Sequence, residues 1–295
     1  MKKIWINRKY ICKVTTTIIS GLYAFLGFIG TLAPIDEVLS DQKSVWMRIG
    51  ISFSILLIMW TTCFIIVGLI LLNKKRFEVV SGNNGHKVYL QYGDLLDKNQ
   101  VINSGKRRSI VIPVNRCFDT RVDNHLVSEQ TLHGKVFKQL YSQNIYTEES
   151  LNTKIQKLLK EKNTESDKLS KKEKPDGNRD RYPVGTVVDV PGDHEVHYLL
   201  WALSTFDCNL KAYTSMQEYS LAVQRLVEEC NKESEGYPIL IPTVGAGLSR
   251  TKKEQYDILM YLLSTFRLNK SEINCDIHIV VREDIKNEVA IMNLK

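Results

Sequence analysis

The sequence has six cysteines and six histidines but contains no Cys-x-x-Cys pair and no cluster of histidines. A zinc site or a small disulfide framework would need such spacing, so neither is expected, and the cysteines are predicted to be reduced and mostly buried. Gly-x-Gly-x-x-Gly and Gly-Lys-Ser/Thr are absent as well. The chain therefore has neither the dinucleotide-binding fingerprint nor a P-loop.

Most of the chain also lacks net charge, although the whole carries +7. Residues 1–76 contain ten Lys and Arg against three Asp and Glu, and the remainder contains 30 residues of each sign. The basic excess therefore flanks two apolar segments instead of covering a soluble surface, and a nucleic-acid partner is not expected.

Two long segments without charge lie at 14–35 and 49–73, with 22 and 25 residues. Each is long enough to cross a hydrocarbon core of about 30 Å as a helix. A cleaved signal peptide is the alternative for the first segment, and two buried globular helices are the alternative for both. Because two such segments follow each other closely, we predict that residues 1–76 are a membrane anchor with two transmembrane helices.

The orientation of this anchor follows from its basic residues. Five Lys and Arg precede the first segment, and Lys74-Lys75-Arg76 follows the second. The connection Asp36–Arg48 carries three acids and two bases. Positive flanks remain on the cytoplasmic side, so both termini are predicted to be cytoplasmic.

One face of the first helix is expected to carry small residues, because Ser20, Ala24, Gly27 and Thr31 follow helical spacing. Small side chains allow close packing of helices in lipid. Two partners are open: the second helix of the same chain, or the first helix of another copy.

From residue 77 onward, strand patterns alternate with helical patterns. This alternation predicts a layered α/β fold with a mixed, largely parallel sheet. In a charged insertion at about 149–181, the first half is predicted to be a surface helix. Its end is predicted to be solvated and mobile, since 171–178 contains no apolar side chain. The expected strands are 86–92, 109–114, 197–203, 239–241 and 276–281, and the expected helices are 128–141, 215–231 and 251–267.

Three of the predicted strands end in residues suited to binding. They are Gly93-Asp94-Leu95, the segment Asn115–Asp119, and the segment Thr243–Arg250 with its Gly245-Ala246-Gly247 turn. A strand, a glycine turn and a helix N-terminus form an anion site, although an ordinary strand-to-helix turn has the same pattern. Parallel sheets bind ligands beyond the carboxyl ends of their strands, so the three segments are expected to form one crevice.

These segments together resemble a macro domain, a module that binds ADP-ribose. In that family a strand ends in Gly-Asp-hydrophobic, as Gly93-Asp94-Leu95 does, and the aspartate accepts a hydrogen bond from the adenine amino group. Val114-Asn115 matches an Asn-containing loop, and 242–247 matches Pro-x-x-Gly-x-Gly, which surrounds phosphate and ribose. The resemblance covers about 77–295 and implies a layered α/β/α fold.

The loop after Asn115 departs from the hydrolases of that family. They carry Asn-x-x-Asn and a glycine-rich run, whereas the second Asn and the glycine run are absent here. The resemblance therefore implies a receptor without catalytic residues, and the alternative is a membrane-anchored ADP-ribosyl hydrolase.

Two transmembrane helices followed by this divergent domain resemble the membrane effector of bacterial type II Thoeris anti-phage defence. The resemblance implies an inner-membrane protein whose ligand is an ADP-ribose derivative, a histidine conjugate made from NAD by a Toll/interleukin-1-receptor-like enzyme. It also implies oligomerisation and membrane disruption, with no cofactor or metal. The residues predicted to contact the ligand are Asp94, Leu95, Asn115, Arg116, Phe118, Asp119, His133, Gly134, Lys135, Thr243, Val244, Gly245, Ala246, Gly247, Leu248, Ser249 and Arg250.

Several of these residues also have ordinary structural interpretations. Asp94 and Asn115 can cap turns. Arg250 suits phosphate oxygens but also suits a solvated helix start. His133 and Lys135 can lie on a surface loop. Cys117 is expected to be a packed thiol, because no paired base is evident.

Overall fold

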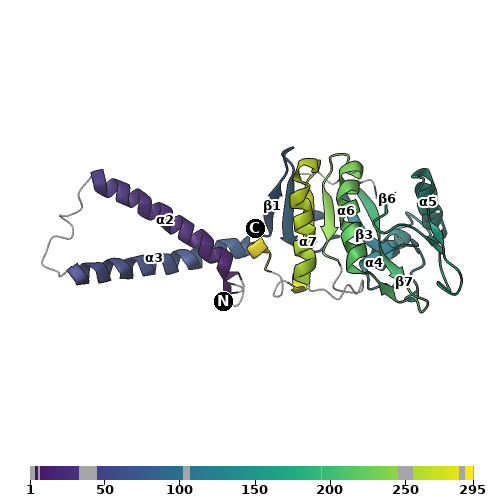
Figure 1. Ribbon diagram of the computed structural model, residues 1–295, viewed down its shortest axis with the longest axis horizontal. Coiled ribbons are helices and arrows are strands. Elements are labelled where there is room, and N and C mark those ends of the chain that lie inside the picture. The colour runs from purple at the N-terminus through teal and green to yellow at the C-terminus, as the bar shows by residue number, and fades with distance from the viewer. Residues whose placement is uncertain are drawn as a thin grey trace. The chain divides into compact units, whose positions relative to one another are not determined.

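The computed structural model describes residues 4–5, 7–32, 45–101, 107–193, 195–244, 255–285 and 290–294. The chain divides into two compact units (Figure 1). One is Met1–Lys75 together with Ala290–Lys295, and the other is Arg76–Val289. Sequence analysis places everything after residue 76 in the soluble domain, so the grouping of the last residues with the first unit is a difference from that expectation.

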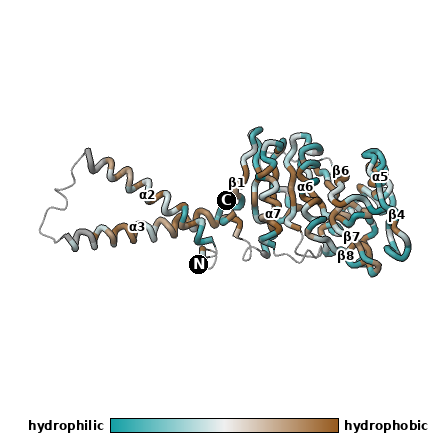
Figure 2. Tube along the Cα trace, in the orientation of Figure 1, coloured by the Kyte–Doolittle hydropathy of each residue, from teal (hydrophilic) through white to brown (hydrophobic). Residues whose placement is uncertain are grey.

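The first unit contains helices α2 (Arg8–Leu32) and α3 (Val45–Asn73). Both are long and apolar enough to cross a membrane, over Arg8–Phe28 and Gly50–Asn73. Large apolar side chains on both helices are exposed, including Phe28 at 63% and Ile70 at 65%. The hydropathy of both helices can be followed in Figure 2. Most of the predicted connection between them lies outside the described residues.

Helices α2 and α3 form a hairpin. They pack against each other at its base, near the start of α2 and the end of α3. Ile11 and Thr15 of α2 are fully buried, and a side chain at Gly68 of α3 would meet Ile11 at 3.7 Å. The short helix η5 (Ile291–Leu294) packs here too, where the Asn293 side chain accepts a hydrogen bond from the Tyr10 amide at 3.3 Å. The end of the chain is therefore part of the hairpin base.

Farther along the hairpin, Trp60 lies opposite α2. Its indole N–H donates to Thr16 Oγ1 at 3.4 Å, and its ring stacks on Phe64. A cleft of about 380 Å³ between the helices is lined by Ser20 among others. A side chain at Gly27 would meet no described atom within 4 Å. The small-residue face therefore lies beside α3 at one end and is open at Gly27.

The second unit is built on one mixed sheet. Within the described residues, eight strands pair in the order β1-β2-β10-β9-β3-β7-β6, with β8 added to β7. The pairs among β2, β10, β9, β3 and β7 are parallel, and the remaining pairs are antiparallel. This confirms the predicted largely parallel sheet. The strands are β1 (Arg76–Ser81), β2 (Lys87–Tyr92), β3 (Arg108–Asn115), β6 (Val187–Pro191), β7 (Val196–Phe206), β8 (Ala212–Tyr213), β9 (Ile239–Pro242) and β10 (Ile277–Val281).

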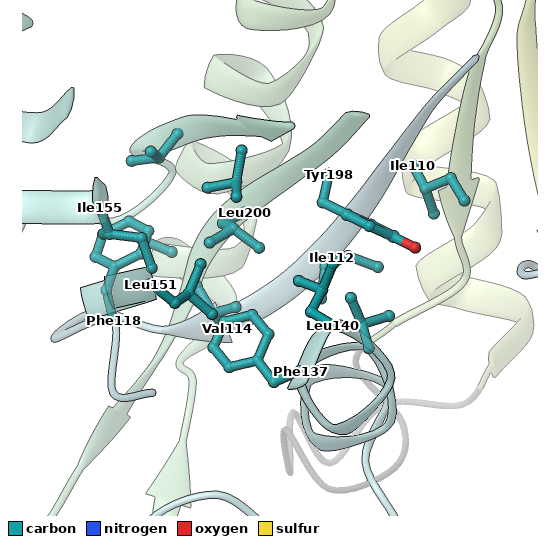
Figure 3. Packing of buried hydrophobic residues seen from close by; sticks show 14 of the residues in the cluster. Ile110, Ile112, Val114, Phe118, Phe137, Leu140, Leu151, Ile155, Tyr198 and Leu200 are labelled. Atoms are coloured by element: carbon teal, nitrogen blue, oxygen red, sulfur yellow. The ribbon is translucent and has the colours of Figure 1, made fainter. Parts of the chain in front are cut away.

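Helices cover both faces because alternate side chains of each buried strand point in opposite directions. On one face, Ile110 and Ile112 of β3 belong to a core completed by α4 (Leu132–Ser142) and α5 (Glu148–Glu161), as Figure 3 shows. On the other face, Trp201 of β7 donates to the Ala222 carbonyl of α6 (Met216–Glu233). Helix α7 (Gln255–Leu268) packs beside α6. The result is a three-layer α/β/α unit.

The charged insertion has the predicted surface helix in its first half and differs from its predicted form in its second half. Its first half is α5, which is amphipathic and buries Leu151, Ile155 and Leu159. Its second half contains the two-stranded pair β4 (Asp167–Lys168) and β5 (Asp180–Arg181). Lys174 between these strands is fully buried, so the expectation of a solvated excursion is wrong there. Whether the insertion moves stays a prediction.

Candidate functional site

The carboxyl ends of the parallel strands meet along one edge of the sheet. The Gly93 amide donates to the Val281 carbonyl at 3.0 Å, and the Thr243 amide donates to the Val280 carbonyl at 3.3 Å. The residues that follow β2 and β9 are therefore both held beside the end of β10. The Arg116 amide after β3 is likewise bonded to Ser204 of β7, at 2.8 Å.

Asp94 stands exposed at this edge. One carboxylate oxygen accepts a hydrogen bond from the Leu96 amide at 3.0 Å, which is the aspartate turn considered above. For the second oxygen the structure records no protein partner within the described residues. The same carboxylate can therefore cap its turn and still accept a hydrogen bond from a ligand. Neighbouring Leu95 is buried in the core and has a packing role.

A buried polar network supports this turn from below. Gln91 of β2 donates to both the carbonyl and the side-chain oxygen of Gln100, each at 2.7 Å. Gln91 Oε1 therefore accepts from His278 Nδ1, 3.0 Å away, so the imidazole carries its proton on Nδ1. Burial lowers the pKa of His278 to about 4, which keeps it neutral. No motif in the sequence indicates this network.

The glycine segment after β9 is described only at its start. Thr243 and Val244 follow β9 and are half-buried. Gly245, Ala246, Gly247, Leu248, Ser249 and Arg250 lie outside the described residues, as does the predicted helix start at Thr251. Helix α7 is described from Gln255. The predicted phosphate contacts therefore stay predictions.

After β3 the chain makes a tight buried turn. The Asn115 side chain accepts a hydrogen bond from the Cys117 amide at 3.0 Å, which is the turn-capping role. Phe118 adopts a positive φ of 51°, an uncommon conformation for a large side chain. It is 1% exposed, and its ring meets Tyr182 edge-on at 5.7 Å. Phe118 occupies the third place after Asn115, where Asn-x-x-Asn has its second asparagine.

Arg116 is committed to contacts within the protein. Its guanidinium donates to the Tyr182 carbonyl at 2.8 Å and to Thr205 Oγ1 at 3.3 Å. It also forms an ion pair with Glu218 at 3.2 Å, near the start of α6. These contacts tie the loop to α6. Because they engage the guanidinium group, Arg116 is poorly placed for the ligand contact that was predicted for it.

Asp119 is buried with a lysine from the insertion. Lys174 Nζ donates to its two carboxylate oxygens at 3.0 and 2.7 Å. Burial raises the pKa of Asp119, and the positive charge of Lys174 opposes that rise. The carboxylate is 1% exposed, so it fixes the loop instead of presenting itself at the surface.

The predicted group at the start of α4 divides into buried and exposed residues. His133 is 6% exposed, and burial lowers its pKa to about 3, although a hydrogen bond to the Asp119 main chain opposes this. Its Nε2 has no hydrogen-bond partner in the part of the chain that the structure describes. Gly134 is required by packing, because a side chain there would collide with the Ser128 carbonyl. Lys135 is exposed.

Cys117 has the character of a packed thiol. It is 5% exposed, and burial raises its pKa to about 11, so the nucleophilic thiolate is scarce at neutral pH. Among the described residues, no three His, Cys, Asp or Glu side chains are grouped closely enough to hold a metal ion.

Two hollows among the described residues lie away from this edge. One is the cleft between α2 and α3. The other, of about 400 Å³, lies where α4 connects to α5, around Tyr141 and Ser150. The edge at the carboxyl ends of the strands is defined by the sheet topology and by the hydrogen bonds that hold Gly93 and Thr243 beside β10.

Comparison with known proteins agrees with this architecture. Residues 88–282 match the family described as Thoeris protein ThsA, macro domain. The Thoeris protein ThsA of Bacillus amyloliquefaciens (strain Y2) is 24% identical over 269 residues, which cover 89% of this chain and 79% of that protein.

Solved structures give more distant likenesses. A mutant of the Oceanobacillus iheyensis macrodomain is 11% identical with a TM-score of 0.45, covering 74% of this chain and 91% of its own. The macrodomain of Mycobacterium tuberculosis DarG is 12% identical with a TM-score of 0.39, covering 65% and 96%. These likenesses are too distant to bear on function.

The match to the family extends from β2 through β10, which is more than half of the chain and includes every parallel strand of the sheet. The resemblance found in the sequence is thereby confirmed. The chain belongs to the Thoeris ThsA macro-domain family, and its second unit has the macro-domain fold.

Proposed function

We propose that the soluble unit is a receptor for an ADP-ribose derivative, bound at the carboxyl edge of the parallel strands. The observation that carries this proposal is the exposed Asp94 carboxylate, held by its own turn at that edge with one oxygen available. The macro-domain fold resembles that of ADP-ribose binders. A histidine conjugate is the proposed natural ligand, on the strength of the resemblance to type II Thoeris effectors.

We further propose that binding occurs without hydrolysis. The Asn115 side chain is used within its own turn, and Phe118 replaces the second asparagine of the hydrolases with a buried ring. The Cys117 thiol is held neutral by burial. None of these three groups is poised to activate a water molecule.

Ligand binding is tested on the full chain in detergent. ADP-ribose, its histidine conjugate and NAD are each added while the thermal midpoint is recorded. At about a hundred times its dissociation constant a ligand should stabilise the protein by about 2.7 kcal/mol. Asp94→Ala should reduce that shift. No shift with any of the three compounds would overturn the proposal.

A matched control is Asp193→Ala. Asp193 caps a turn in the same way, accepting from the Glu195 amide at 3.1 Å, but it precedes β7 at the opposite edge of the sheet. This variant should bind as the native chain does.

Recovery of free ADP-ribose from an ADP-ribosylated protein would support the hydrolase alternative instead.

The first unit is proposed to be the membrane anchor, with both termini cytoplasmic. The basic flanks of α2 and α3 support this orientation. Single cysteines at Ser40 and Ser81, in a background without native cysteines, test it in intact cells with an impermeant reagent. Labelling at position 40 and protection at position 81 are expected, and the reverse pattern would contradict it.

Membrane disruption is proposed to follow from ligand-driven association of copies along the small-residue face of α2. Two helices cannot enclose a channel, so several chains are needed. Gly27→Leu should leave ligand binding unchanged and weaken envelope damage in cells. Gly21→Leu is the matched control, since Gly21 is equally open but lies about 120° away from Gly27 around the helix. Equal damage in both variants would refute the role of this face.

A further inference from the structure

The insertion contributes a fully buried charge to the loop after β3. Lys174 is 0% exposed and Asp119 is 1% exposed. The ammonium group has three N–H donors, and it has three acceptors: the two oxygens of Asp119 and the Asn178 carbonyl at 2.6 Å. All three N–H donors of Lys174 are therefore paired, and the acceptors come from two segments that are far apart in the sequence, one with Asp119 and one with Asn178.

The carboxylate is satisfied as well. Its Oδ1 accepts a second hydrogen bond, from the Asn178 amide at 2.7 Å. Gly177 makes this arrangement possible, because it adopts a φ of 76° and a side chain there would collide with Asp119. Burying two charges is a poor way to gain stability, since their desolvation offsets the attraction between them. The pair therefore matters chiefly for the segment that it holds in place.

What it holds is the turn between Asn115 and Asp119. The Asn178 side chain donates to the Phe118 carbonyl at 3.2 Å, which ties the insertion to the residue with positive φ. The main chain of Asp119 in turn hydrogen-bonds the imidazole of His133. Among the described residues, Nε2 of this buried imidazole has no hydrogen-bond partner.

We propose that Lys174 is a positioning residue of the ligand site, which fixes the conformation of the Asn115–Asp119 turn and, through Asp119, the orientation of His133. This inference rests on the proposed function, because the turn follows β3 at the edge where the ligand is placed. The insertion is then part of the receptor and not a solvated excursion from it.

The test replaces the pair by apolar side chains of similar volume, Lys174→Met with Asp119→Leu, in the full chain in detergent. The double variant avoids leaving one charge buried and alone, so it is expected to fold with a thermal midpoint near that of the native chain. Lys174→Met alone keeps Asp119 and is measured beside it. Lys168→Met is the control, since Lys168 lies in the same insertion and forms an exposed ion pair with Asp180.

Two readouts separate this inference from the proposed function. The first is the reaction of Cys117 with a thiol reagent, followed by mass spectrometry of its peptide, which needs no ligand. Cys117 lies inside the turn and is buried, so it should react several-fold faster in both Lys174 variants and at the native rate in Lys168→Met. The second is the affinity for ADP-ribose and its histidine conjugate, which should fall by about tenfold or more, as when a partner that orients a binding residue is removed.

The outcomes are distinguishable. If the native chain binds neither compound, the proposed function fails while the thiol readout still decides whether Lys174 fixes the turn. If the native chain binds and a folded double variant binds equally well, the inference is overturned. It is also overturned if Cys117 reacts at the native rate in the double variant, because the turn would then keep its conformation without the Lys174–Asp119 pair.

Discussion

The two ends of the candidate site are built in different ways. After β2, the predicted binding group Asp94 is exposed and is held by a local turn. After β3, the predicted binding groups Arg116 and Asp119 are engaged inside the protein by Glu218 and Lys174. A residue type that suits a ligand can therefore be used by the fold itself, and burial distinguishes the two cases.

The largest expected effect is on the β3 side. Lys174→Met should lower the free energy of unfolding by about 3–5 kcal/mol at neutral pH, because it leaves the Asp119 charge buried without a partner. Burial already raises the pKa of Asp119, and removing the lysine raises it further. Protonated Asp119 is favoured in the folded state, so the deficit should shrink as pH falls. A deficit that does not depend on pH would point to lost packing instead.

A smaller effect is expected at the turn of the insertion. Gly177→Ala should cost about 1–3 kcal/mol more than Gly85→Ala in thermal or denaturant unfolding. Both glycines have similar positive φ, 76° and 83°, but only Gly177 has atoms of Asp119 and Lys174 where the new side chain would go. Equal costs would mean that the insertion is not held tightly against the β3 loop.

Buried histidines should make stability depend on pH. Burial holds the pKa of His133 at about 3, below its ordinary 6.5. Below about pH 6.5 the unfolded chain takes up a proton that the folded chain refuses, so the stability present above that pH is lost as pH falls. The slope should be about 1.4 kcal/mol per pH unit for this group. His133→Gln should remove it, as measured by unfolding between pH 7 and 4, and His278→Gln should act similarly.

The smallest effect belongs to the β2 side. Asp94→Ala should change the free energy of unfolding by about 0.5 kcal/mol or less, as exposed substitutions usually do, while ligand binding weakens. Thermal unfolding without ligand measures the first quantity. A large loss of stability would show that Asp94 is as structural as Asp119, and the contrast between the two loops would then disappear.

Local signals in the sequence predicted much of the fold. Ser215 and Glu218 have capping-box spacing, and both hydrogen bonds of that box are present at the start of α6. Helix α4 begins at Leu132 and not near Ser128, because Thr131 caps it and the preceding residues form a turn. Strand β1 was missed, although Phe77 and Val80 in it are buried. The pattern there was too short to separate from its basic flank.

Pairing between distant residues could not be predicted. Lys174 lies in a stretch without apolar side chains, which is the usual composition of a solvated segment. Only the three-dimensional placement of Asp119, 55 positions earlier, reveals that its charge is matched and buried. The same holds for Gln91 and His278, whose contact spans 187 positions. Spacing rules apply within an element and carry no information about such pairs.

The packing of Ile291–Leu294 at the hairpin base has a mechanical consequence. The soluble unit is joined to the hairpin by the peptide link between Lys75 and Arg76, and also by the chain that leads from Ile285 to this buried turn. The hairpin base is therefore built from segments far apart in the sequence, and after cleavage between 285 and 290 only non-covalent contacts, such as the Tyr10–Asn293 hydrogen bond, would hold Ile291–Leu294 there.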